Sequence, residues 1–126
     1  MKIGMIPGSG GSVRLARMIG LSRVKDMIMR GKRISGEEAF NWGLASELVE
    51  KDKLEVTISK LVDELCSVSP LAQRAIKTVL NTSQDAPLHV AIELEGETYG
   101  RLRSSDDFNE GVKSFVEKRK PVYKGN

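Results

Sequence analysis

The chain has 126 residues, of which 40% are hydrophobic and 29% are charged; this composition is typical of one folded domain and excludes a disordered protein. No apolar run approaches the ~20 residues that a membrane span needs, and the opening MKIGMIPGSGG has the pattern of neither a signal peptide nor a transit peptide. We therefore expect a cytoplasmic protein without membrane contact, and the single cysteine, Cys66, fits a reducing compartment.

The net charge of +3 is distributed unevenly. Residues 1–33 carry eight basic and one acidic side chain, residues 34–117 carry eight basic and sixteen acidic ones, and residues 118–126 add four basic ones. Basic ends suit an anionic partner such as a phosphate-bearing cofactor, although solvated helix faces explain the same charges. Nucleic acid is not the expected partner, because the six aromatic residues do not alternate with the basic clusters as a base-stacking surface requires.

The first third of the chain predicts three short helices. Apolar residues at helical spacing cover 13–19 and 21–28, and each run stops at a glycine, Gly20 and Gly31 respectively. A third helix starts at the capping box of Ser35-Gly36-Glu37-Glu38 and ends at Gly43. The residues that follow, 45–49, are typical of a brief extended segment that is too short to build a sheet alone.

Four further helices follow, each with an apolar face that is expected to pack in the core. Their predicted ranges are 54–65, 70–80, 88–103 and from 106 into the segment EKRKP, with a loop over 81–87. Ser69 caps the second of them and Pro70 fits its first turn, while Ser104 or Ser105 caps the last. The predicted fold class is therefore mainly α, with about seven helices and at most one or two short strands.

Gly96 and Gly100 interrupt the helix over 88–103 at a spacing of four residues. Each glycine costs about 1 kcal/mol relative to alanine in a helix interior. We therefore expect another helix to approach this one closely, at an oligomer interface.

Catalytic side chains are scarce. His89 is the only histidine, so no ordinary histidine-based metal site is expected, and a surface or packing role suits it better than catalysis. Cys66 is expected to be buried as a small hydrophobe. Two acidic pairs, Glu37-Glu38 and Asp106-Asp107, stand at helix starts, where carboxylates favour the helix dipole, so a structural role is expected for both.

The segment Gly8-Ser9-Gly10-Gly11-Ser12 leads directly into a helix. It matches neither the GxGxxG dinucleotide fingerprint nor a P-loop, which ends in Lys followed by Ser or Thr. Its backbone N–H groups could face an anion or a polarised carbonyl group, as at other helix N-termini. A plain turn is the alternative interpretation.

Three separated motifs resemble the enoyl-CoA hydratase/isomerase family, also called the crotonase family. They are GMIPGSGGSVRLARMIG at 4–20 with GKRISGEEAFNWGLASELV at 31–49, then Ser69-Pro70, then DDFNEGVKSFVEKRKPVY at 106–123. The match covers essentially the whole chain in the right order. Ser12 stands where the family frequently has Thr, and Arg30-Gly31 stands where it has Thr-Gly; neither departure selects a reaction within the family.

The resemblance implies a C-terminal half of a crotonase fold, since members are about twice as long and begin with a spiral of β-strands and helices. Residues 1–50 would end the crotonase core, and residues 51–126 would form a helical region for trimerisation and CoA contact. The oxyanion hole and two acid/base glutamates would lie mostly upstream of Met1. The chain alone would then be inactive and would need that upstream half as a partner.

The resemblance also implies roles for three residues here. Gly8 corresponds to a glycine whose backbone N–H helps to hold the reacting water or acyl group. Tyr99 lies where an aromatic ring commonly meets the CoA adenine, and Lys118 lies where a lysine reaches the CoA phosphates. Tyr99 as a core residue and Lys118 as a charge at a helix end remain the alternatives.

The expected reaction is addition of water to a 2,3-enoyl-CoA in fatty acid or related acyl-CoA metabolism. Isomerisation or another enolate reaction is the alternative within the family, and a non-catalytic helical assembly module is the alternative outside enzymology. The resemblance implies no metal and no covalent cofactor, with coenzyme A present only as part of the substrate. It also implies a homo-oligomer, either a trimer or a dimer of trimers.

Overall fold

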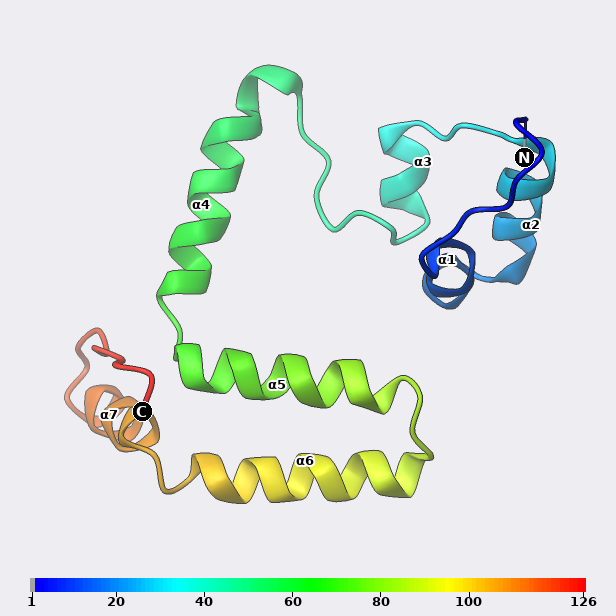
Figure 1. Ribbon diagram of the computed structural model, residues 1–126. Coiled ribbons are helices and arrows are strands. Elements are labelled where there is room, and N and C mark those ends of the chain that lie inside the picture. The colour runs from blue at the N-terminus through cyan, green and yellow to red at the C-terminus, as the bar shows by residue number, and fades with distance from the viewer. Residues whose placement is uncertain (1) are drawn as a thin grey trace. The chain divides into compact units, whose positions relative to one another are not determined.

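The computed structural model describes residues 2–126, and these contain seven α-helices and a single 3-10 turn, joined by loops without any strand (Figure 1). The prediction of a mainly α chain with about seven helices is confirmed. The helices are α1 (Gly11–Ile19), α2 (Leu21–Arg30), α3 (Gly36–Asn41), α4 (Leu54–Cys66), α5 (Pro70–Ser83), α6 (Leu88–Leu102) and α7 (Asp106–Val116), and the 3-10 turn η1 covers Lys51–Lys53.

The local start and stop signals act as the sequence predicts. Helix α2 ends at Gly31, which has a φ of 60° in the left-handed region that glycine adopts without a steric penalty. The Ser35 hydroxyl accepts a hydrogen bond from the Glu38 N–H at 3.0 Å, and the Glu38 carboxylate accepts one from the Ser35 N–H at 3.1 Å, which completes the capping box. Helix α5 differs from the prediction, because it continues to Ser83 and leaves only residues 84–87 as a loop.

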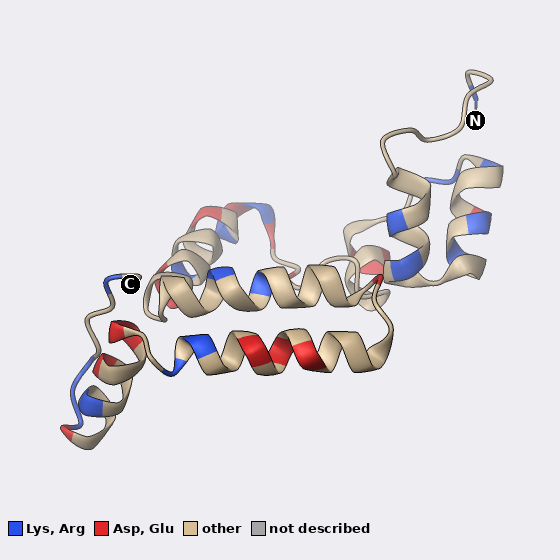
Figure 2. Ribbon diagram, turned by 60° about the horizontal axis from the view of Figure 1, so that its bottom comes forward, with Lys and Arg blue, Asp and Glu red and all other residues tan. Residues whose placement is uncertain are grey.

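The chain divides into two compact units, and the first comprises the residues up to Leu54. Here α1 packs against α2, with Ile19 and Val24 buried between them. The ring of Trp42, which follows α3, lies within cation–π distance of Arg23 at 5.3 Å and of Lys32 at 5.6 Å. Figure 2 marks the positions of the basic residues along α1 and α2, which account for most of the positive charge of the first 33 residues.

The second unit extends from Glu55 to Asn126 and contains most of the long helices. Helices α5 and α6 lie side by side, with Val79 of α5 and Thr98 of α6 buried. Acidic residues occupy the middle of α6 (Figure 2). Among the described residues, every helix is too short or too polar to span a bilayer.

Asp107 joins three parts of the second unit. Its side chain is 3% exposed, and it accepts hydrogen bonds from the Ser69 hydroxyl at 2.6 Å and from the N–H groups of Lys124 and Gly125 at 2.8 and 3.0 Å. Burial by itself raises the pKa of the Asp107 carboxyl, but the hydrogen bonds from Ser69 and from the backbone outweigh it, so the pKa is lowered. The carboxylate therefore holds the start of α5, the start of α7 and the C-terminal segment together.

The apolar helix faces are largely uncovered, which contradicts the prediction that they form a core. Among the described residues, only Ile19, Val24 and Val79 are buried apolar side chains. Most of the apolar face of α4 is exposed, with only Leu61 half-buried, and Cys66 at the end of this helix is exposed rather than buried. The physical reason is that neither α4 nor α7 packs closely along another helix in the way that α5 packs along α6.

The accessible surface confirms that the chain is under-packed. The chain has a mass of 13.9 kDa and exposes 10197 Å², whereas two separate compact units of about 6 and about 8 kDa would together expose only about 8,000 Å². A Cβ atom added at Gly96 or Gly100 would meet nothing within 4 Å, so the expected close approach to α6 is not made by the described chain itself.

Replacement of Asp107 is expected to destabilise the second unit strongly. Asp107→Ala leaves the Ser69 hydroxyl and two backbone N–H groups without their acceptor, so we expect the thermal midpoint of unfolding to fall by roughly 5–10 °C. Asp106→Ala is the matched control, because it removes an adjacent exposed carboxylate from the same helix turn and should change the midpoint far less. Equal effects of the two variants in circular dichroism melts would show that only the helix dipole is involved.

Candidate functional site

The glycine-rich loop before α1 is held in shape by Arg14. The Arg14 guanidinium donates a hydrogen bond to the Ser9 carbonyl at 2.5 Å, and the Gly11 N–H donates to the Gly8 carbonyl at 3.0 Å. Ser9 and Gly10 both have positive φ, 54° and 75°. A Cβ atom at Gly10 would lie 2.7 Å from an Arg14 nitrogen, so this position requires glycine for both its conformation and its space.

Gly8 lies under a different constraint. Its φ lies outside the left-handed region, and a Cβ atom added to it would meet nothing within 4 Å. The loop therefore does not itself require glycine at this position. What the glycine provides is open space beside an exposed backbone, which is the property needed for a ligand to approach closely.

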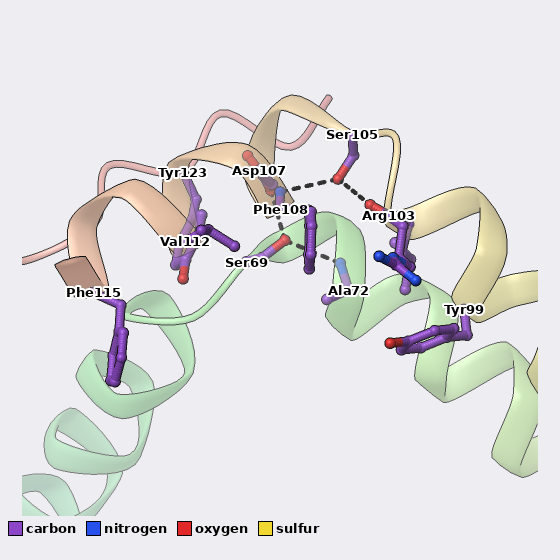
Figure 3. A pocket seen from close by; sticks show the side chains of 12 residues that line it. Ser69, Ala72, Tyr99, Arg103, Ser105, Asp107, Phe108, Val112, Phe115 and Tyr123 are labelled. Carbon is purple, nitrogen blue, oxygen red and sulfur yellow. Dashed lines mark hydrogen bonds between the residues drawn. The ribbon is translucent and has the colours of Figure 1, made fainter.

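The second unit contains a cavity of about 500 Å³ at the junction of α5, α6, α7 and the C-terminal segment (Figure 3). Its lining is mostly apolar and contains four aromatic rings, those of Tyr99, Phe108, Phe115 and Tyr123. Tyr99 is 62% exposed, so within the described chain it does not act as a core residue. The Arg103 guanidinium lies 6.0 Å from the centroid of that ring. An aromatic ring and a cation thus lie together at one side of an open cavity.

Lys118 follows α7 in a conformation that is unusual for its residue type. Its φ is 53°, its N–H donates to the Phe115 carbonyl at 3.3 Å, and the next N–H, of Arg119, donates to the Ser114 carbonyl at 3.1 Å. This pair of bonds is the Schellman motif, in which glycine usually occupies the position of Lys118. Only two non-glycine residues of the described chain have positive φ, Ser9 and Lys118, and both lie at or beside positions that the sequence singled out.

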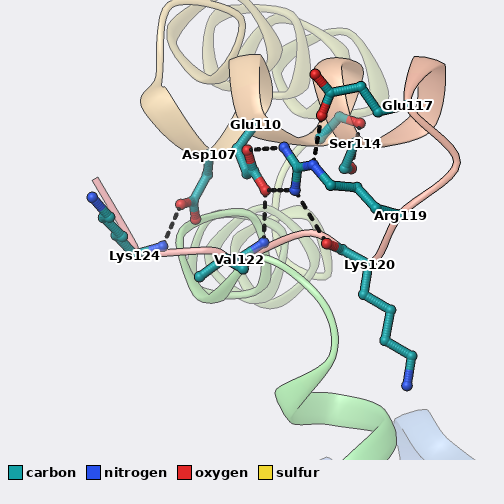
Figure 4. A network of polar contacts seen from close by, with 9 residues as sticks. Asp107, Glu110, Ser114, Glu117, Arg119, Lys120, Val122 and Lys124 are labelled. Atoms are coloured by element: carbon teal, nitrogen blue, oxygen red, sulfur yellow. Dashed lines mark hydrogen bonds and ion pairs between the residues drawn. The ribbon is translucent and has the colours of Figure 1, made fainter.

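A network of charged side chains holds the segment that follows Lys118 (Figure 4). The Arg119 guanidinium donates to both carboxylate oxygens of Glu110 at 2.5 and 2.8 Å and to Glu117 at 2.6 Å. The Val122 N–H donates to Glu110 Oε1 at 2.8 Å. The hydrogen bonds from Arg119 and then Val122 lower the pKa of the Glu110 carboxyl to about 2, while the two carboxylates raise the pKa of Arg119.

The direction of the Glu110 pKa shift determines how the stabilisation contributed by Glu110 depends on pH. Because the pKa in the folded chain lies below the ordinary value of 4.5, Glu110 contributes its full stabilisation above about pH 4.5 and loses it as the pH falls towards 2. The network is therefore intact at neutral pH.

The structure brings Tyr99 and Phe115 of α7 to one cavity. Lys118, three residues after Phe115 in the sequence, is not among the lining residues, and Gly8 belongs to the other unit. Sequence reasoning missed Arg103, Glu110 and Arg119, and it assigned Phe115 to a packing face although its side chain is 85% exposed. The position of Phe115, three residues before Lys118, is a sequence signal that could have marked it as a candidate site residue. The Glu110–Arg119 pair spans nine residues and matches no local spacing rule.

The described residues can bind and orient a ligand, but they show no acid/base pair suited to proton transfer. His89 is exposed. A hydrogen bond from Lys32 and then one from the Ser35 N–H lower the pKa of the Glu38 carboxyl, which keeps it ionised and committed to the helix cap. Across residues 2–126 no three His, Cys, Asp or Glu side chains are grouped so that they could hold a metal ion.

Known proteins resemble this chain in both sequence and fold. A mitochondrial methylglutaconyl-CoA hydratase of Pyricularia oryzae is 37% identical over 98% of this chain and 40% of its own length. A carnitinyl-CoA dehydratase of Salmonella typhi is 34% identical over 98% of this chain and 49% of its own length. The crystal structure of an enoyl-CoA hydratase from Bacillus anthracis superposes with a TM-score of 0.95 at 35% identity, over 99% of this chain and 48% of that one.

The chain thus spans about half the length of the relatives it matches. Those relatives have the crotonase fold, and the described helices correspond to part of it. The family model for enoyl-CoA hydratase/isomerase matches residues 1–126, from the glycine loop to the segment after Lys118. The chain belongs to the enoyl-CoA hydratase/isomerase family.

Proposed function

We propose that this chain is the C-terminal half of an enzyme that adds water across the double bond of a 2,3-enoyl-CoA thioester. The family membership carries the proposal, together with relatives that are named as hydratases and a dehydratase of CoA thioesters. Such an enzyme stabilises negative charge that develops on the thioester oxygen, and preorganised N–H donors achieve this most effectively. We propose no metal and no resident cofactor, with coenzyme A entering only as part of the substrate.

In this proposal Gly8 places its backbone N–H beside the reacting water or acyl group. The open space beside Gly8 and the rigid loop held by Arg14 support this role. A backbone N–H can orient a reacting group but cannot transfer a proton, so the acid and base must come from elsewhere in the enzyme. We place them in the upstream half.

Lys118 and Tyr99 are proposed to bind the nucleotide part of CoA. The cavity volume of about 500 Å³ lies within the range of small-molecule sites, about 300–1,000 Å³. The exposed Tyr99 ring offers a surface on which an adenine can stack, and the exposed Lys118 ammonium offers a partner for phosphate. A lysine in a conformation that favours glycine is most easily explained by a need for its side chain.

We also propose that the enzyme is a homo-oligomer, a trimer or a dimer of trimers. The uncovered apolar helix faces and the excess accessible surface support further packing partners. The bare backbone at Gly96 and Gly100 on α6 leaves room for a helix to approach. Sedimentation of the complete enzyme tests this assembly.

Isomerisation of an enoyl-CoA, or another enolate reaction, is the second candidate. The matching family model covers both hydratases and isomerases, and the residues that would choose between them are not among those described here. An assay of 2,3-enoyl-CoA against 3,4-enoyl-CoA substrates distinguishes the two reactions. A non-catalytic assembly module is the candidate outside enzymology, and the first prediction below separates it from the others.

The 126 residues alone are expected to show no hydratase activity. Loss of each acid/base role costs about 10²–10⁴-fold in rate, and loss of an oxyanion donor costs about 10²–10³-fold more. The measurement follows the loss of crotonyl-CoA absorbance with the purified chain, before and after addition of the separately produced upstream half. Turnover by the chain alone would contradict the proposal, and absence of turnover from the mixture and from the fused enzyme would favour the assembly module.

Gly8→Ala is expected to reduce turnover without destabilising the fold. The added methyl group meets no protein atom, so the melting temperature of the chain should remain the same or rise slightly. In the assembled enzyme the same methyl group should obstruct the reacting group and lower kcat by about 10-fold or more. Gly10→Ala is the contrasting variant, because strain at a φ of 75° and the contact with Arg14 should lower its melting temperature. Full activity of Gly8→Ala would contradict the role.

Lys118→Gly is expected to stabilise the chain while weakening CoA binding. Glycine removes a left-handed backbone penalty of about 1 kcal/mol, so the melting temperature should rise. The KM for an acyl-CoA should increase a few-fold with little change in kcat, because one exposed charged contact is worth about 0.5–1 kcal/mol in ground and transition states alike. Lys120→Ala is the matched control. An acyl-pantetheine substrate, which lacks the nucleotide, should be insensitive to Lys118→Gly; equal losses on both substrates would make Lys118 structural.

A further inference from the structure

One carboxylate binds two residues of the segment that directly follows Lys118. Glu110 lies in the middle of α7, and Arg119, which directly follows Lys118, donates to both of its oxygens. The Val122 N–H, three residues further along the same segment, also donates to Glu110 Oε1. Glu110 therefore closes a loop of four residues, 119–122, onto the helix that precedes it (Figure 4).

The hydrogen bonds to Glu110 offset part of the conformational cost of the left-handed backbone at Lys118. The φ of 53° is costly for a residue with a side chain, and such a conformation persists only where the surroundings hold it. The backbone supplies two hydrogen bonds, from the N–H groups of Lys118 and Arg119. The side-chain bonds to Glu110 fix the next residues, so they prevent Lys118 from relaxing to a negative φ.

The same contacts decide which basic residue faces an anion. Arg119 is engaged by Glu110, by Glu117 and by the Lys120 carbonyl, so most of its donors are occupied and its charge is compensated by two carboxylates. The Lys120 side chain extends away from this network in Figure 4. In the basic segment Lys118-Arg119-Lys120, the middle residue therefore has a structural role and is not the group that meets phosphate.

We propose that Glu110 is a positioning residue, which through Arg119 and Val122 holds Lys118 in the conformation that presents its ammonium group to the nucleotide of CoA. The inference rests on the proposed function of Lys118. Glu110 itself touches no substrate. Its effect is on the geometry of the turn.

The test is steady-state kinetics of the assembled enzyme with acyl-CoA and acyl-pantetheine substrates. Glu110→Gln keeps the shape of the side chain but loses the paired, charged contact with Arg119. We expect the KM for acyl-CoA to rise a few-fold, with kcat nearly unchanged and no change in the KM for acyl-pantetheine. Asp106→Asn, which removes an exposed carboxylate from the same helix, is the control and should change neither constant.

A double variant separates positioning from general destabilisation. If Glu110 acts through Lys118, Glu110→Gln in a Lys118→Ala background should raise the KM for acyl-CoA no further. Additive effects, or equal effects on both substrates, would overturn the inference. Arg119→Lys removes the bidentate contact with Glu110 by changing the cation instead of the carboxylate, so it should give the same kinetic effects as Glu110→Gln. If Glu110→Gln does not fold, Arg119→Lys takes its place in the test.

The outcomes for the two proposals are distinguishable. If Lys118→Ala leaves the KM for acyl-CoA unchanged, the proposed role of Lys118 fails and this inference fails with it. If Lys118→Ala raises that KM but Glu110→Gln and Arg119→Lys do not, only the positioning role of Glu110 is wrong.

Discussion

The buried carboxylate of Asp107 is the constraint on which the second unit depends. An ionised group that is 3% exposed is costly to bury unless donors surround it, and here a hydroxyl and backbone N–H groups do so. Those donors come from the start of α5 and from the C-terminal segment, so they can meet Asp107 only in one arrangement of α5, α7 and the chain end. The arrangement leaves the cavity beside Tyr99 and Phe115, and Asp107 and Ser69 themselves lie in its wall.

A polar centre of this kind matters because hydrophobic burial within the chain contributes little to its stability. Most amphipathic helix faces remain exposed, and the buried apolar side chains of the described residues are few. Hydrophobic burial usually supplies the main stabilisation of a domain, and it is non-directional. Here capping bonds, the Asp107 centre and the Glu110–Arg119 pair provide the geometry, while most of the apolar faces stay exposed.

The glycine loop of the first unit and the turn after α7 in the second unit use backbone conformation in different ways. At the glycine loop, Ser9 and Gly10 turn the chain so that Gly8 precedes α1 with free space beside it. After α7, Lys118 turns the chain in a position that favours glycine, and the neighbouring carboxylates support the turn. Both features suit binding and orientation rather than proton transfer, in line with the proposal that the acid and base come from elsewhere in the enzyme.

The sequence by itself determined the features that depend on near neighbours. Helix stops at Gly20 and Gly31, the capping box of Ser35 and Glu38, and the mainly α class all follow from interactions within about four residues, which the pattern of residue types records directly. The family resemblance also predicted roles in CoA binding for Tyr99 and Lys118, and these roles stay predictions. Only the tertiary structure decided that Asp107 is a buried centre rather than an ordinary helix-start acid, that Cys66 is exposed, and that Glu110 meets Arg119. These outcomes depend on which segments meet in space, because an acid or a cysteine has the same local preferences whether or not a distant donor or helix comes to cover it.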